Sequence, residues 1–279
     1  MSKIIVTHLS PDFDGIPAIW LLRRFHPDFT DAKVAFVPVG DATYNNQPVD
    51  SSPDVVHVDT GMGRFDHHDR DEYTCGAKLV YEWLVNGGFI SGEDLALKRM
   101  VDVITDLDHG KDNEWLEADN DRYEFALHNI LVGWKIAFPK RDEEYVEWVM
   151  HALDGAYRLM RSKVVAETEL EKGIRFKTVW GLAVGCGTAN DGVLDLGIKK
   201  GLALVVRKDP KTGQVRITGT KKAGVDLSRT FSLLQKKDPA ATWYLHPSKV
   251  LLRNGSTRNP GMVPTKLSLE EVIELLQSV

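Results

Sequence analysis

Residues 3–17 read KIIVTHLSPDFDGIP, and this stretch decides the fold. The apolar run at residues 3–8 is typical of a short buried strand that ends in polar residues. An amphipathic helix is expected directly after it, over residues 14–25. Pro17 is tolerated in the first turn of that helix, because the N–H that proline lacks would have no partner there. A strand that passes at once into a helix predicts the first part of a βαβ unit.

The alternation of strand and helix continues to about residue 110. Further strands are expected at residues 33–38 and 54–59, and further helices at residues 75–86, 93–107 and 114–131. Strands that alternate with helices are typical of a mainly parallel sheet with flanking helices. The sequence therefore predicts an α/β fold for the N-terminal part of the chain.

A different pattern follows a long amphipathic stretch at residues 142–172, which predicts a helix between two lobes. Strands are then expected at residues 179–184, 202–207 and 214–218, and helices at residues 226–235 and 268–278. We therefore predict three parts: an α/β domain at 1–140, a helical linker at 141–174, and a smaller α+β domain at 175–279.

Charge is distributed unevenly along the 279 residues, of which 43% are hydrophobic and 27% charged. Residues 1–150 contain 28 Asp and Glu against 14 Lys and Arg, while residues 151–279 contain 12 against 21. An acidic half joined to a basic half suits a protein that holds cations in one lobe and an anionic substrate against the other. Two lobes that simply attract each other are the plainer alternative.

Several classes of protein do not fit the sequence. Cys75 and Cys186 lie far apart and form neither a CxxC pair nor a disulfide framework. The apolar run near the N-terminus is too short for a signal peptide, and no stretch approaches the roughly 18 apolar residues of a membrane span. The expectation is a soluble cytoplasmic protein without a membrane partner, and the sequence does not choose between a monomer and a homodimer.

Acidic residues and histidines gather where the first and third predicted strands end. His8, Asp12 and Asp14 follow the first strand, Asp59 ends the third, and His67 comes eight residues later. The carboxyl ends of parallel strands meet at one crevice, so these side chains should converge. Carboxylates with imidazoles suit Mn²⁺, Fe²⁺, Co²⁺ or Zn²⁺, and several carboxylates together repel unless cations neutralise them. A pair of divalent cations is the prediction, although Asp12 and Asp14 could instead cap the helix that follows.

The order of these residues resembles a known family signature. It comprises His8-x3-Asp12-x-Asp14, then Asp59, then Asp66-His67-His68, then Asp106. This order is similar to the four motifs of the DHH phosphoesterase superfamily, which includes RecJ-type exonucleases, oligoribonuclease/pAp phosphatases, cyclic dinucleotide phosphodiesterases and family II pyrophosphatases. The motifs cover roughly residues 4–110.

The resemblance implies a hydrolase that cleaves a phosphate ester of a nucleotide or short single-stranded oligonucleotide with two divalent cations. Mn²⁺ is the first expectation, and Mg²⁺, Co²⁺ or Zn²⁺ are alternatives. One cation would be held by His8, Asp12 and Asp59, and the other by Asp14, His67, Asp106 and a shared Asp59. The two catalytic residues implied are His68, which would face the substrate phosphate, and Asp66, which would orient His67 through its ring N–H.

The fourth motif leaves a choice open between two aspartates. Ile104-Thr105-Asp106 best matches the family pattern of a small residue before the aspartate, so Asp106 is the preferred ligand. Asp108, in the sequence Asp108-His109-Gly110, is the alternative.

The C-terminal half resembles the family's substrate-binding DHHA1 domain more loosely. The usual run of glycines before a histidine is absent, and Thr220-Lys221-Lys222 stands where the family places an arginine. The expected substrate-binding residues are His68 together with Lys221, Lys222, Arg253, Asn254, Gly255 and Ser256. The sequence is also compatible with three other functions: a pyrophosphatase-like enzyme, a catalytically silent nucleotide-binding module, and an interaction protein without metal.

Overall fold

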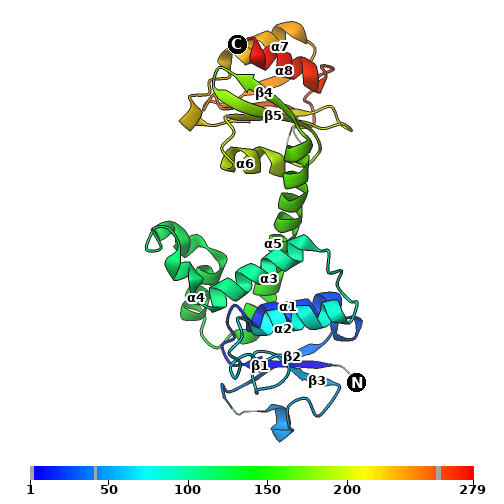
Figure 1. Cartoon of the computed structure of the whole chain (residues 1–279), viewed down its shortest axis with the longest axis vertical. Helices are drawn as coiled ribbons and strands as arrows, with labels where there is room; N and C mark the ends of the chain where they lie inside the picture. Colours follow the sequence, from blue (N-terminus) through cyan, green and yellow to red (C-terminus); the bar gives the residue numbers. More distant parts are fainter. Residues whose placement is uncertain (1–2, 41–42, 256–258) are drawn as a thin grey trace. The chain divides into compact units, whose positions relative to one another are not determined.

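The computed structural model describes residues 3–40, 43–255 and 259–279. The chain forms two compact units, Met1–Met160 and Arg161–Val279 (Figure 1). In the described part of the chain, no helix combines the length and apolar character that a membrane crossing needs.

The first unit is built on a parallel three-stranded sheet. Its strands are β1 (Ile4–His8), β2 (Lys33–Val37) and β3 (Val55–His57), in the order β2-β1-β3. Ile5 pairs with Val34 on one side and with Val56 on the other, so the apolar centre of β1 is buried between its neighbours. The strands lie where the hydrophobic pattern predicts them, and their carboxyl ends meet at one edge.

Four helices belong to the first unit alone, and a fifth begins in it. They are α1 (Gly15–Phe25), α2 (Gly76–Asn86), α3 (Leu95–Asp108), α4 (Leu127–Ala137) and α5 (Asp142–Lys172). Three-residue to five-residue 3₁₀ turns lie at Pro27–Phe29, Tyr44–Asn46, Lys111–Glu114 and Asp121–Phe125. Helix α1 packs against α2, and α2 against α3 (Figure 1).

The prediction of one helix over residues 114–131 was wrong. The segment before Leu127 forms two 3₁₀ turns, and α4 starts only at that residue. The side chain of Asn120 accepts a hydrogen bond from the Arg122 N–H, and Glu117 has a φ of 55°. Side chains that bond to their own backbone in this way compete with helix formation.

Helix α5 spans the residues for which the sequence predicts a long helix. Its first part packs on α1, where Asp154 accepts hydrogen bonds from the Trp20 indole at 3.1 Å and from Arg24 at 2.6 Å. The division between the two units falls inside this helix, after Met160.

The second unit is an α+β arrangement around a mixed six-stranded sheet, in the order β4-β5-β6-β7-β9-β8. The strands are β4 (Ile174–Thr178), β5 (Gly181–Gly187), β6 (Leu204–Lys208), β7 (Val215–Gly219), β8 (Trp243–Leu245) and β9 (Leu251–Asn254). The helices are α6 (Gly192–Lys199), α7 (Ser228–Lys237) and α8 (Leu269–Gln277), and a 3₁₀ turn lies at Lys221–Ala223. Among these described strands, only β5 and β6 pair in parallel.

Both faces of this sheet are covered in its middle. Leu204 and Val206 of β6 lie in one core with residues of α7 and α8. Val205 lies in a second core with residues of α6 and the end of α5. Figure 1 shows α6 beside the end of α5, next to this sheet. Alternate residues of a strand face opposite sides of the sheet. Because β6 is buried on both faces, its sequence is a continuous apolar run and does not alternate between apolar and polar residues.

Candidate metal centre

Asp59 lies at the centre of the site, directly after β3. Its backbone N–H donates to the Phe65 carbonyl at 2.9 Å, and its φ of 52° is the left-handed conformation that non-glycine residues seldom adopt. The residue is only 2% exposed. Neither carboxylate oxygen has a hydrogen-bond partner among the residues that the structure describes. A buried carboxylate without a hydrogen bond is costly, and residues with a strained backbone concentrate at functional sites.

His8 and Asp12 face one oxygen of Asp59. The Nε2 atom of His8 lies 3.3 Å from Asp59 Oδ2 and 3.8 Å from Asp12 Oδ2. The other oxygen of Asp12 accepts hydrogen bonds from the N–H groups of Asp14 and Gly15, at 2.9 and 3.2 Å. Asp12 therefore holds the start of α1 with one oxygen and presents the second to His8. One ligand atom each of His8, Asp12 and Asp59 lie within 4.8 Å of one another.

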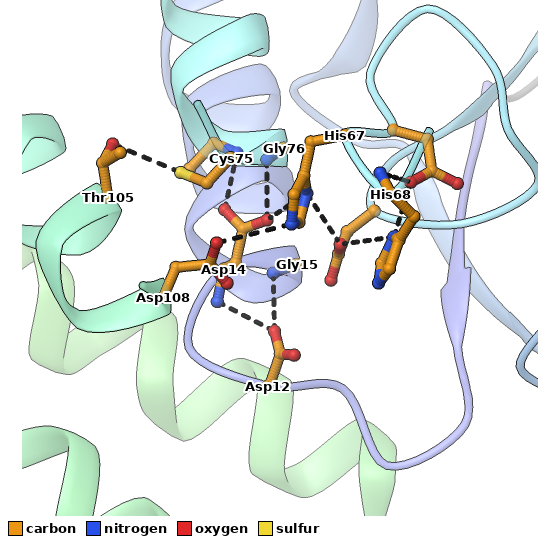
Figure 2. A network of polar contacts seen from close by, with 12 residues as sticks. Asp12, Asp14, Gly15, His67, His68, Cys75, Gly76, Thr105 and Asp108 are labelled. Carbon is orange, nitrogen blue, oxygen red and sulfur yellow. Dashed lines mark hydrogen bonds and ion pairs between the residues drawn. The ribbon is translucent and has the colours of Figure 1, made fainter. Parts of the chain in front are cut away.

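Asp14 does not cap its own helix through its side chain. Its two oxygens accept hydrogen bonds from Gly76 N at 2.6 Å and Ala77 N at 2.7 Å, at the start of α2 (Figure 2). Two N–H donors at a helix N-terminus favour a negative charge. The contact joins the starts of α1 and α2 and fixes the direction in which Asp14 faces the site. Spare lone pairs remain on both oxygens for a further ligand.

His67 and Asp108 complete a second group around Asp14. His67 Nδ1 lies 3.6 Å from both Asp14 Oδ2 and Asp59 Oδ1, and its Nε2 lies 3.4 Å from Asp108 Oδ2 (Figure 2). Ligand atoms of Asp14, His67 and Asp108 lie within 4.8 Å of one another. Asp59 therefore presents one oxygen to His8 and the other to His67, between the two groups.

The expectation that Asp106 joins this group is not what the structure shows. Asp106 Oδ1 accepts hydrogen bonds from the Tyr73 hydroxyl at 2.7 Å and from Lys111 Nζ at 2.8 Å, and its side chain is 46% exposed. Asp108 faces His67 instead. Residues two apart on a helix point about 200° apart, so only one of the two aspartates can face the site.

Asp66 also differs from its expected role, because it holds His68 and not His67. Asp66 Oδ1 lies 2.7 Å from the ring Nδ1 of His68 and accepts a hydrogen bond from the His68 N–H at 3.1 Å. The second oxygen accepts from the Met62 N–H at 2.7 Å. Both oxygens are thereby used, and His68 keeps Nε2 as the nitrogen that can face a ligand.

Two glycines let the helices approach the site closely. A Cβ atom on Gly15 would lie 2.9 Å from Thr7 Oγ1 and 3.1 Å from Asp59 Oδ2. A Cβ atom on Gly76 would lie 3.0 Å from Asp14 Oδ2 and 3.1 Å from the Phe65 carbonyl. A side chain at either position would displace a proposed ligand, which is a physical reason for glycine there.

Burial controls the proton affinities of the carboxylates. It raises the pKa of Asp59 to about 8 and, with the charge of Asp14, the pKa of Asp108 to about 6. Burial also raises the pKa of Asp14, despite its two N–H donors. The Asp59 carboxylate in turn raises the pKa of the His8 imidazole to about 9. Burial and mutual repulsion thus disfavour negative charge on these carboxylates, and a bound cation would offset both effects.

The residues present fit a pair of divalent cations. Asp59 Oδ1, Asp59 Oδ2 and His67 Nδ1 are buried ligand atoms without hydrogen-bond partners among the described residues. The two groups, His8-Asp12-Asp59 and Asp14-His67-Asp108, offer only oxygen and imidazole nitrogen. That donor set suits Mn²⁺ and related ions and excludes a closed thiolate zinc site.

The C-terminal residues predicted to bind substrate do not form one cluster. Asn254 is fully buried, and its amide bonds the carbonyls of Thr242 and Val263 and the N–H of Thr265. Gly255 is a turn residue with a φ of 90°. These two therefore have structural roles, and Ser256 lies outside the described residues.

Three of the predicted basic residues of the second unit are exposed. Arg253 pairs across the sheet with Arg216 near the start of β7, while Lys221 and Lys222 follow its end. The backbone from Arg216 to Lys221 runs through β7 and the extended Thr220, so these places lie about 17 Å apart at roughly 3.4 Å per residue. A single small phosphate would not span them.

Sequence reasoning missed some of the groups that shape the site. No motif indicates that the Gly76 and Ala77 N–H groups hold Asp14, because that contact joins residues 62 and 63 apart. Lys135 was also missed. It lines a cavity of about 310 Å³ together with Asp12, Asp14 and Asp108, and only the fold of α4 brings it there.

Comparison with known proteins identifies only distant structural similarity. No family model matches the chain, and no curated protein matches its sequence. One similar solved structure is described as the DHH domain of a member of a family of ribosomal proteins. It is 12% identical, with a TM-score of 0.35 over 99% of this chain and 86% of that chain. Another is exonuclease RecJ bound to manganese, 11% identical, with a TM-score of 0.34 over 99% and 89%. Similarity at this level does not establish the family.

Proposed function

We propose that the protein is a two-metal phosphoesterase. The observation that carries this proposal is the state of Asp59, whose two buried oxygens have no hydrogen-bond partner in the described chain and lie between His8 and His67. A hydrogen-bonded structural role would leave such oxygens satisfied. Cations held by Asp59 would account for both its burial and its missing hydrogen bonds.

The proposed ligands divide into two sets, and Asp59 of the first set also lies 3.6 Å from His67 of the second. His8, Asp12 and Asp59 would hold one cation, and Asp14, His67 and Asp108 would hold the other. Mn²⁺ is the proposed ion, and Mg²⁺, Co²⁺ or Zn²⁺ would fit the same oxygen and nitrogen donors. Four carboxylates carry up to four negative charges, which two divalent ions balance.

The chemistry divides between the ions and the side chains. When bound, two cations activate a water as the nucleophile and stabilise the phosphoryl oxygens during in-line displacement. His68 would donate from Nε2 to a phosphoryl or leaving-group oxygen. Asp66 contacts the opposite ring nitrogen at 2.7 Å, so it fixes the direction of the ring and stabilises the doubly protonated imidazole that donation from Nε2 requires. Asp66 is therefore a positioning residue, and His68 the catalytic one.

A phosphate ester of a nucleotide or short oligonucleotide is the proposed substrate. The basic second half of the chain favours a polyanion over a small uncharged ligand. Lys221, Lys222 and Arg253 are exposed cations that suit successive phosphates better than one inorganic phosphoanhydride, because the two lysines follow the end of β7 and Arg253 of β9 pairs near its start. This separation counts against the pyrophosphatase-like alternative.

Metal content and hydrolysis test the proposal together. Protein loaded with Mn²⁺ and freed of excess ion should contain two ions per chain by mass spectrometry. It should cleave at least one of a panel of short oligonucleotides, pAp, cyclic dinucleotides and pyrophosphate, and a chelator should abolish cleavage. His67→Ala should lose both properties.

The matched control is His151→Ala, which removes an exposed imidazole on α5. It should retain metal content and hydrolysis. Full activity of the His67 variant, or wild-type protein that binds no divalent ion, would contradict the assignment.

A further inference from the structure

A second cavity lies beside the proposed metal centre, within the first unit. It has a volume of about 510 Å³ and lies between the loop after β1, the end of α4 and the start of α5. Leu9 and Ser10 form one wall, and they stand between the proposed ligands His8 and Asp12 in the chain. The volume is in the range that small-molecule sites usually have.

The floor of this cavity is aromatic. Trp134 and Phe138 line it, with ring centroids 4.8 Å apart, and Trp134 stacks on Trp148 at 5.4 Å and 17°. The Trp134 indole N–H is buried without a hydrogen-bond partner in the described chain. Phe138 is 43% exposed and Leu9 is 49% exposed, so apolar surface remains open to a ligand. Rigid, partly open aromatic rings are the platforms on which nucleic-acid bases stack.

The rim of the cavity is cationic. Lys135, Lys140 and Arg141 line it against a single acidic residue, Asp142. Asp142 is partly engaged, because it accepts a hydrogen bond from the Ser10 N–H at 3.1 Å. The excess of positive charge suits a ligand that joins a flat ring to a phosphate.

Lys135 and Tyr145 are shared between this cavity and the cavity at the metal centre. Both line it, and both also line the smaller cavity that Asp12, Asp14 and Asp108 share. Lys135 Nζ donates to the Ser10 carbonyl at 2.9 Å and lies 5.3 Å from the centre of the Tyr145 ring. The aromatic floor therefore belongs to a cavity that shares two lining residues with the cavity of the metal ligands.

We propose that this aromatic pocket binds the base of the nucleotide whose phosphate ester lies at the metal centre. The proposal rests on the phosphoesterase function above and assigns the residues that recognise the nucleoside of its substrate. Trp134 and Phe138 stack the base, and Lys135 contacts the adjacent phosphate. Inorganic phosphoanhydrides and base-free sugar phosphates lack the group that the floor recognises.

A binding experiment tests the base site without relying on turnover. Adenosine 5′-monophosphate and ribose 5-phosphate, which differ by the base, are titrated into the Mn²⁺-loaded protein by calorimetry. We expect the nucleotide to bind about 10–100-fold more tightly, the effect of one stacked base. Phe138→Ala and Trp134→Ala should remove most of that difference. Phe125→Ala, which removes an 83% exposed ring outside the cavity, should retain it.

A matched pair of esters extends the test to hydrolysis. Thymidine 5′-(4-nitrophenyl phosphate) and methyl 4-nitrophenyl phosphate share a leaving group, and only the first has a nucleoside. Phe138→Ala should lower kcat/KM for the first by about 10–100-fold and leave the second unchanged.

The outcomes separate the two proposals. Equal binding of the two phosphates by wild type, or unchanged preference in both aromatic variants, would overturn the base site. A changed oligomeric state of Phe138→Ala with unchanged nucleotide binding would assign the pocket to a second copy of the chain and also overturn it. Pocket-dependent nucleotide binding without cleavage of either ester would contradict the phosphoesterase function and support the base site.

Discussion

Asp59 of the first unit and Asn254 of the second are both buried polar residues at strand ends, yet their surroundings differ. Asn254 is 0% exposed and makes three hydrogen bonds, two as donor at 2.9 and 3.0 Å and one as acceptor at 2.7 Å. Asp59 is 2% exposed, and its carboxylate accepts none from the described residues. Buried polar groups whose hydrogen bonds are all made within the protein stabilise one fold. Buried polar groups that lack a hydrogen-bond partner are expected where a ligand supplies that partner.

The backbone shows the same contrast. Asn254 ends β9 in a regular ladder opposite Val215, while Asp59 has a φ of 52° just after β3. A strained backbone persists only where surrounding contacts hold it, and here the Asp59 N–H bonds the Phe65 carbonyl. The comparison teaches that burial alone does not distinguish a structural polar residue from a ligand-binding one, and that its partners do.

The largest expected effect comes from Asp59→Asn. Hydrolysis of bis(4-nitrophenyl) phosphate should fall by roughly 10²–10³-fold, the scale of losing a major electrostatic group. The thermal midpoint of the metal-free protein should stay equal or rise, because the change removes a carboxylate whose charged form is disfavoured by burial. Steady-state kinetics and calorimetry measure the two quantities. A fall in metal-free stability would show that Asp59 is a structural residue like Asn254.

Asn254→Ala should give the opposite result. It leaves the Thr265 N–H and two carbonyls without their partner, so the free energy of unfolding should fall by about 2–4 kcal/mol. Urea unfolding in the presence of chelator measures this change. Metal content and hydrolysis per folded molecule should not change.

The neighbouring variant Arg253→Ala removes an exposed side chain and should alter stability by less than about 0.5 kcal/mol. Reduced hydrolysis by folded Asn254→Ala would instead indicate that Asn254 binds substrate, as the sequence predicts.

A smaller effect is expected from the two aspartates of α3. Asp108→Asn should weaken Mn²⁺ binding by about 10–100-fold. Removing a residue that only hydrogen-bonds to a metal ligand already lowers metal affinity by this amount, and Asp108 is proposed to bind the ion itself. Asp106→Asn should leave affinity unchanged, because Asp106 is satisfied by Tyr73 and Lys111 at the surface. Titration calorimetry compares them directly. A greater loss in the Asp106 variant would mean that the motif pattern, and not the observed helix face, identifies the ligand.

Local sequence predicted much of the first unit and less of the second. The three strands of the first sheet and the helices α1, α2, α3 and α5 lie where hydrophobic period and capping residues place them. Strands β4, β8 and β9 and helix α6 were not predicted. Most of these are short elements, and a short apolar run does not identify strand or helix by period alone.

The sequence by itself determined the candidate ligand residues and their order: His8 at the end of one strand with Asp12 and Asp14 after it, and Asp59 after another strand. Tertiary structure alone decided that Asp108 and not Asp106 faces His67, that Asp66 holds His68, and that Asn254 is structural. The reason is physical. Spacing along the chain determines which face of a helix or strand a residue occupies. The groups that its side chain contacts come from segments far away in sequence. Only packing brings those segments together.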